Sequence, residues 1–141
     1  MDGVINVAGH RLSTGEMEEI VAKHPDVAEC AVIGVDDELK GEVPMGFVVL
    51  KEGIERDPKA LVDGIVQLVR DEIGAVASFK VATVVKRLPK TRSGKILRGT
   101  MRAMADGKPW SMPSTIEDKE VLPEIEAAVK ALGYPLKKEH A

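Results

Sequence analysis

The chain of 141 residues has few aromatic side chains, one cysteine and no long apolar run. Aromatic residues make up 3% of the chain, which leaves too few stacking partners for a surface that binds single-stranded nucleic acid. The single cysteine, Cys30, excludes an internal disulfide and is typical of a reducing compartment. Its apolar neighbours predict a small buried side chain. No stretch approaches the roughly 20 apolar residues that a membrane span needs.

The charge balance excludes wholesale binding to anionic polymers. A formal net charge of -3 describes a mildly acidic protein, and 44% hydrophobic residues at this length fit one domain whose core needs neither disulfide nor metal. Asp2, Arg11 and Glu16 place charges in the first residues, so we expect no secretory signal. We therefore expect a cytoplasmic protein that binds neither nucleic acid nor membrane.

Patterns along the chain predict the α+β class, as a small α/β domain in which helices flank one sheet. Val4–Val7 is a short extended run ended by Ala8-Gly9, which indicates an N-terminal β-hairpin. Apolar β-forming runs predict a three-stranded sheet flanked by helices in two or three layers. The strands are expected at 27–35, 45–50 and 81–85, and the helices at 13–23, 57–73, 97–105 and 122–132. We assign the domain to residues 1–109 and a C-terminal helical extension to residues 110–141.

A basic run from Lys86 to Arg102 holds seven Lys or Arg residues and no acidic one. Pro89 fixes the entry to its loop, and Ser93-Gly94 predict a pliable tip that carries Lys95. Such a run must either meet anions or be well solvated. Because the rest of the chain is mildly acidic, we expect the anion to be small.

The residues of this loop exclude one familiar interpretation and leave others open. Ser93-Gly94-Lys95 is similar to the end of a nucleotide P-loop, but Pro89 stands where that motif needs glycine and Ile96 where it needs Ser or Thr. Phe79 is the one aromatic residue near the cations, which disfavours a nucleic-acid surface. A solvated stretch without function stays open, as does a free-standing module that binds a nucleotide or a protein through the loop.

A second motif, Gly9-His10-Arg11, follows an extended run and precedes a capped helix. A glycine there lets a ligand approach the backbone, and an arginine can hold a phosphate. No Ser/His/Asp or Cys/His constellation accompanies either motif, and His24 before Pro25 is typical of a helix-terminal residue. The chain by itself therefore lacks a complete active site.

The loop Leu88–Ile96 resembles the C-terminal signature loop of AMP-forming acyl-CoA synthetases of the short-chain (acetyl and propionyl) branch, in the adenylate-forming superfamily. The segment from Asp2 to Arg11 is similar to the hinge of that family and the strand and loop after it. The resemblance implies the small mobile C-terminal domain of an acid–thiol ligase. Its partner would be a larger N-terminal adenylation domain that binds ATP, Mg²⁺ and the carboxylic acid. The fragment alone is then expected to be inactive.

For the first half-reaction, the resemblance implies that Lys95 contacts the reacting carboxylate and the nucleotide while the acid is joined to AMP and pyrophosphate leaves. A lysine ammonium is a compact, mobile cation that can offset charge developing on these oxygens. The resemblance also implies that a protein acetyltransferase and deacetylase act on Lys95. Acetylation would remove the charge and shut off adenylation.

For the second half-reaction, the resemblance implies that the domain rotates about a hinge at Asp2. The segment that then lines the pantetheine tunnel of CoA is Ala8, Gly9, His10 and Arg11. Gly9 leaves room for the thiol arm, and Arg11 corresponds to a nucleotide-contacting arginine. Arg70 matches an arginine near the 3′-phosphate of CoA, with an ordinary surface helix cation as the alternative. A metal has been placed near the residue matching His24 in the acetyl branch, but we expect no metal ligand here.

Some positions depart from the family pattern. Gly3 stands where a second hinge acid is usual, and Ala8 stands where many relatives have serine, which removes one hydroxyl contact to CoA. Pro109-Trp110 and the segment 114–118 look more like the propionyl branch than the acetyl branch. We therefore favour propionate over acetate as the substrate.

Overall fold

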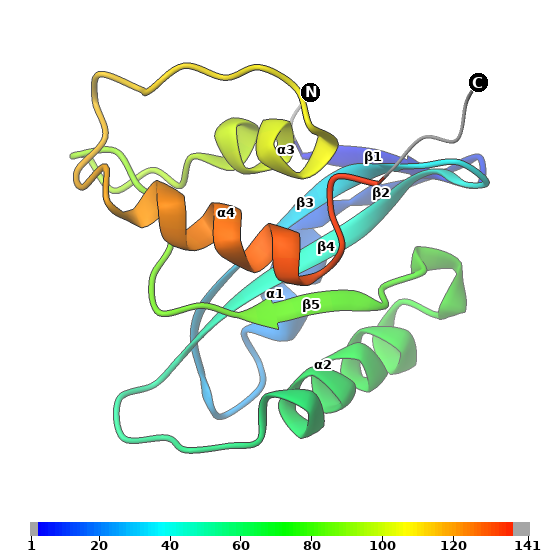
Figure 1. Cartoon of the computed structure of the whole chain (residues 1–141). Helices are drawn as coiled ribbons and strands as arrows, with labels where there is room; N and C mark the ends of the chain where they lie inside the picture. The colour runs from blue at the N-terminus through cyan, green and yellow to red at the C-terminus, as the bar shows by residue number, and fades with distance from the viewer. Residues whose placement is uncertain (1–2, 137–141) are drawn as a thin grey trace.

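The computed structural model describes residues 3–136. No helix in this part of the chain is long and apolar enough to cross a membrane. Its strands and helices, which include one short 3-10 helix, η1, are arranged as Figure 1 shows. In chain order they are β1 (Val4–Val7), β2 (His10–Ser13), α1 (Thr14–Val21), β3 (Val27–Asp37), β4 (Gly41–Leu50), α2 (Pro58–Glu72), η1 (Ala75–Ala77), β5 (Val81–Val84), α3 (Arg98–Asp106) and α4 (Val121–Ala131).

The sheet is built around a long antiparallel pair, β3 and β4. On the other side of β4, β5 pairs with it in parallel and β1 pairs with it at Val7 and Gly41. β1 in turn carries β2 along its outer side, so β2 is an edge strand. The five strands thus form one sheet with helices between them, which confirms the predicted α+β class.

The sheet is larger than the three strands expected from the sequence, because the N-terminal hairpin joins it. Ile5 and Val7 alternate with exposed residues along β1, and both are fully buried. A strand buried on one face gains by extending an existing sheet, since its backbone groups then also find partners. The apolar pattern of four residues could not show which strand β1 would meet.

Helices cover both faces of the sheet, so the domain has three layers. In β3, Ala31, Ile33 and Val35 belong to one buried cluster with α3 and α4, whereas Val32 belongs to the other with α1 and α2. This follows from the period of two in a strand, which sends neighbouring side chains to opposite faces. Near-continuous apolar runs in the two long strands are therefore the signature of a sheet covered on both sides.

Local capping signals place the helix ends. The Ser13 hydroxyl accepts a hydrogen bond from the backbone N–H of Glu16 at 3.1 Å and begins α1. The Asp57 carboxylate accepts one from Ala60 at 3.3 Å and begins α2, as the Asp-Pro pair predicts. Gly107, with a φ of 69°, ends α3. Each of these ends was predicted within a few residues from the sequence.

The extension after residue 109 packs onto the face that carries α3. Leu122, Ile125 and Val129 of α4 are buried in the same cluster as Met101 and Phe47. Burying a side chain of this size contributes about 1.5–3 kcal/mol. The division of the chain at residue 109 stays a prediction, but in the described residues the extension shares the core of the domain.

The turn between β1 and β2 holds one non-glycine residue in the left-handed region. Ala8 has a φ of 50° and its neighbour Gly9 a φ of 88°, as the two-residue hairpin turn of type I′ requires. An L-residue pays about 1 kcal/mol there, and glycine does not. We expect Ala8→Gly to raise the free energy of unfolding in urea by about 1 kcal/mol and the Tm by about 3–4 °C.

The control for this prediction is Ala127→Gly, in the exposed middle of α4. Glycine in a helix interior lowers stability by about 0.5–1 kcal/mol, so the two substitutions are expected to shift the urea midpoint in opposite directions. A lower urea midpoint in both variants would contradict the prediction that the backbone is strained at Ala8.

Candidate functional site

The Lys95 loop, residues 89–97, is a closed hydrogen-bonded turn. The backbone N–H of Thr91 donates to the carbonyl of Lys95 at 2.8 Å, and that of Gly94 donates to the carbonyl of Thr91 at 2.8 Å. The Thr91 hydroxyl accepts the N–H of Lys95 at 3.1 Å and lies 3.0 Å from the Ser93 hydroxyl. Gly94, with a φ of 89°, makes the tight turn possible. The pliability expected of this tip stays a prediction, and the structure shows a turn closed by hydrogen bonds with the Lys95 side chain exposed.

Most cations of the basic run form ion pairs with acidic side chains of the same chain. Arg87 pairs with Asp118 and Glu124, Lys90 with Glu29, Arg98 with Glu18, and Arg102 with Asp36, Glu42 and Asp106. Among residues 3–136, no acidic side chain lies within ion-pair distance of the three others, Lys86, Arg92 and Lys95. Because these three are exposed, an incoming anion would meet Lys95 and its neighbours rather than the whole run.

The Arg98–Glu18 pair ties the start of α3 to α1. The guanidinium of Arg98 donates to both carboxylate oxygens of Glu18, at 2.6 and 2.9 Å. These bonds raise the pKa of Arg98 against the opposing effect of burial. The same carboxylate accepts the backbone N–H of Val32 at 2.8 Å, so the helix that follows the loop is held to both α1 and β3.

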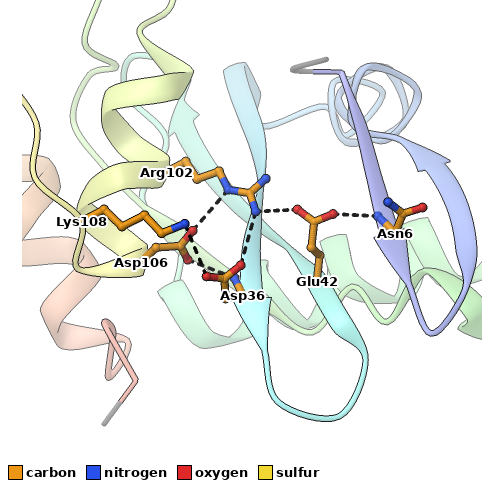
Figure 2. A network of polar contacts seen from close by, with 6 residues as sticks. All are labelled: Asn6, Asp36, Glu42, Arg102, Asp106 and Lys108. Atoms are coloured by element: carbon orange, nitrogen blue, oxygen red, sulfur yellow. Dashed lines mark hydrogen bonds and ion pairs between the residues drawn. The ribbon is translucent and has the colours of Figure 1, made fainter. Parts of the chain in front are cut away.

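A second network connects α3 with the sheet and the hairpin (Figure 2). Arg102 reaches Asp36 of β3 and Glu42 of β4, and Glu42 accepts the backbone N–H of Asn6 in β1 at 2.9 Å. Burial would lower the pKa of Arg102, but hydrogen bonds to Glu42 and Asp106 outweigh it and raise the pKa. The Lys95 loop and the hairpin are thus attached to one continuous scaffold.

The second candidate motif forms the tip of the hairpin. Gly9 is exposed, and a Cβ added to it would meet no atom of residues 3–136 within 4 Å. His10 and Arg11 follow on β2, and both side chains are exposed on this edge strand. The backbone N–H of Ala8 donates to the carbonyl of Lys40 at 2.7 Å, which fixes the tip beside the β3–β4 turn. The space above Gly9 is therefore open to a ligand.

Arg70 lies at the same end of the molecule as the hairpin tip. It is exposed in the last turn of α2 and lines a small hollow with Ser78 and Lys80. The Lys40 ammonium donates to the Ser78 hydroxyl at 2.6 Å, so Lys40 links the tip to this hollow. Sequence reasoning missed Lys40, since a lysine in a turn carries no local signal of the distant serine that it meets.

The structure does not bring the two motifs together. The Lys95 loop, which leads into α3, and the β1–β2 tip lie at opposite ends of the sheet in Figure 1. One small partner site cannot touch both motifs at once, because the core of the domain lies between them. Each motif can therefore complete a site only with a partner that meets its own end of the domain.

Two predicted positions, Asp2 of the hinge and His24, lie outside both motifs. Asp2 lies outside the described residues. His24 accepts the backbone N–H of Asp26 on its Nδ1 at 3.1 Å, as a helix-terminal residue can. Within residues 3–136 no group of three or more His, Cys, Asp or Glu side chains is arranged to hold a metal.

Cys30 is partly buried beside α1, where its Sγ lies 3.3 Å from the carbonyl of Glu18. Burial raises the pKa of this thiol to about 11, and the negative charge of Glu18 adds to the effect. The thiol is therefore protonated at neutral pH and a poor nucleophile. This agrees with the structural role expected of it.

Comparison with known proteins defines the class of this domain. Residues 16–95, from α1 to the lysine itself, match the model of the AMP-binding enzyme C-terminal domain. This chain belongs to that family. An uncharacterized protein of Pseudomonas aeruginosa is 62% identical over 129 residues, which cover 92% of this chain and 20% of that protein. The mitochondrial acyl-CoA synthetase short-chain family member B of Dictyostelium discoideum is 52% identical over 140 residues, 98% of this chain and 20% of the relative.

A solved structure shows the same fold. The acyl-CoA synthetase of Brucella canis aligns with a TM-score of 0.65 and 37% identity, covering 70% of this chain and 18% of that one. This chain thus spans about a fifth of the length of the proteins that it matches. Its relatives are AMP-forming acyl-CoA synthetases, and it corresponds to their C-terminal domain.

Proposed function

We propose that this domain works in an AMP-forming short-chain acyl-CoA synthetase, which converts a carboxylic acid, ATP and CoA into acyl-CoA, AMP and pyrophosphate. The observation that carries the proposal is the placement of the Lys95 loop and the Gly9 tip at opposite ends of one scaffold. Two half-reactions at one active site then require the domain to turn between them. The larger adenylation domain supplies the rest of that site.

In the adenylation step, Lys95 is the residue that this chain contributes. Its ammonium is exposed and has no acidic partner among the described residues, so it is free to neutralise the carboxylate and phosphoryl oxygens as the acyl–phosphate bond forms. The closed turn beneath it fixes the Cα position. The flexible side chain then provides the last few ångströms of approach. Mg²⁺ would be held together with the phosphates of ATP in the larger domain.

In the thioester-forming step, the opposite end of the domain faces the acyl-adenylate. The open space above Gly9 would admit the pantetheine arm, and Arg11 on the edge strand would contact the nucleotide. Arg70 would hold the 3′-phosphate of CoA from the neighbouring hollow. Their common location at one end, joined through Lys40, supports a single CoA surface.

We propose propionate as the acid, on the character of segment 109–118. The acyl pocket itself would lie in the larger domain, so the test is kcat/KM for propionate against acetate in the whole enzyme. We also propose that Lys95 is acetylated and deacetylated reversibly, since it is exposed at the head of a well-formed turn. The cytoplasmic location expected from the sequence stays a prediction.

The decisive experiment restores a whole enzyme. This chain is joined to the remainder of the Dictyostelium discoideum acyl-CoA synthetase, in place of the corresponding fifth of that protein. We expect the fusion to form acyl-CoA from propionate, ATP and CoA, while the domain alone forms none. An inactive fusion, together with tight nucleotide binding by the isolated domain, would favour the free-standing module instead.

A further inference from the structure

The Lys95 loop is hydrogen-bonded to a segment of the C-terminal extension. The backbone N–H of Arg92 donates to the carbonyl of Thr115 at 2.9 Å, and the N–H of Glu117 donates to the carbonyl of Lys90 at 2.8 Å. Thr91 and Ile116 form an antiparallel bridge between these two bonds. The loop therefore has a strand-like partner contributed by residues some 25 positions further along the chain.

Ion pairs join the same two parts of the molecule. Arg87, between β5 and the loop, donates to Asp118 at 2.7 Å and to Glu124 at 2.8 Å. Hydrogen bonds to Glu124 and Asp118 raise the pKa of Arg87. Hydrogen bonds from the backbone of Glu120 and from Arg87 lower the pKa of Asp118. All three side chains are well exposed, and ion pairs between exposed side chains contribute little to the stability of a fold.

The extension is itself held firmly, so it can act as a support. Ile116 is 8% exposed and Leu122 is 1% exposed, and both belong to the core cluster beneath the loop. The opposite side of the loop is held by Lys90, which pairs with Glu29 of β3 at 2.8 Å. The loop thus contacts the sheet through an ion pair on one side and the extension through hydrogen bonds on the other.

The supporting segment lies beyond the part that defines the family. The family match ends at residue 95, whereas the alignments with the relatives of Pseudomonas aeruginosa and Dictyostelium discoideum, of 129 and 140 residues, must include residues 113–124. The aligned region of both relatives therefore extends over residues 113–124, which lie outside the residues that the family model matches.

We propose that residues 113–124, together with Arg87, form a clamp that positions Lys95 for adenylation. This inference rests on the proposed function, and it makes Arg87, Asp118 and Glu124 positioning residues that touch no substrate. Displacing a catalytic group by about 1 Å can cost about 100-fold in rate, while the ion pairs contribute little to overall stability. The clamp should therefore matter far more to one half-reaction than to folding.

The test uses Arg87→Met and the double variant Asp118→Asn/Glu124→Gln in the whole enzyme. Adenylation is measured by pyrophosphate release and thioester formation by the reaction of supplied acyl-adenylate with CoA. We expect kcat for adenylation to fall by about 10- to 100-fold, with thioester formation within about twofold of the parent and the Tm within about 3 °C. The charge-reversed variant Arg87→Glu/Asp118→Arg/Glu124→Arg is expected to recover at least part of the adenylation rate.

A matched control is Arg56→Met, which breaks an exposed ion pair of the same length, 2.7 Å to Asp26, away from the loop. It should leave both half-reactions unchanged. Equal losses in both half-reactions, or no loss in adenylation while Lys95→Ala abolishes it, would overturn the clamp. Unchanged adenylation in Lys95→Ala would instead overturn the proposed function, and the clamp with it.

Discussion

Replacing Lys95 with alanine is expected to slow adenylation by at least about 100-fold in the whole enzyme, while thioester formation from supplied acyl-adenylate stays within a few-fold of the parent rate. Removing one preorganised charge from a developing anion typically costs 100- to 1,000-fold. The side chain is exposed, and within residues 3–136 it makes no ion pair whose loss would disturb the fold. Pyrophosphate release and CoA-dependent turnover measure the two steps separately.

Two further variants sharpen this result. Lys95→Gln, which mimics the acetylated side chain, should be nearly as slow as Lys95→Ala because the charge is gone. Lys86→Ala removes another exposed cation of the same basic run, one that makes no ion pair within residues 3–136, and should change adenylation by less than about twofold. If Lys86→Ala were as damaging as Lys95→Ala, the effect would belong to the general charge of the loop rather than to one lysine.

Replacing Gly9 with asparagine is expected to have the opposite profile, with thioester formation about 100-fold slower and adenylation within a few-fold of the parent. Among residues with a side chain, asparagine tolerates positive φ better than most, and the same backbone strain arises in the control described below. A Cβ added at this position meets no atom of residues 3–136 within 4 Å. A large functional loss would therefore report a ligand that occupies the open space, not a damaged fold.

Gly53→Asn is the matched control for this variant. Gly53 also has a positive φ, 82°, and open space around it, but it lies in the turn after β4, away from the hairpin tip. Its substitution should leave both half-reactions unchanged. Unaffected thioester formation in Gly9→Asn would mean that the pantetheine arm does not pass this surface.

The elements predicted most accurately from the sequence are those with local signals. The Ser13 and Asp57 caps begin helices as predicted, and the apolar stripe of α2 is buried as its spacing requires. The two motifs were also found from the sequence, because each is a continuous stretch of residues. The predicted N-terminal hairpin is confirmed by the pairing of β1 with β2, although β2 itself has three exposed side chains among four residues and no periodic pattern.

The charges of the basic run could not be assigned from the sequence. Arg98 meets Glu18, which lies 80 positions away, and nothing in either neighbourhood indicates the pairing. The hydrogen bonds that hold the loop could not be predicted from the sequence for a related reason. Gly94 suggested a pliable chain, but Thr91 closes the turn and residues 115–117 brace it from outside. A glycine permits a conformation, and the surrounding hydrogen bonds decide whether it is fixed.

The sequence by itself determined the chemistry that this protein can offer: one lysine on a basic loop, one glycine turn followed by histidine and arginine, and helices and strands built from local caps and periodic apolar residues. Only the tertiary structure decided how that chemistry is arranged. It pairs four of the seven cations internally, braces Lys95 with the extension, and places the two motifs at opposite ends of one sheet. The physical reason is range, because turns and helices depend on neighbouring residues, whereas ion pairs and sheet order depend on groups that meet only when the whole chain has folded.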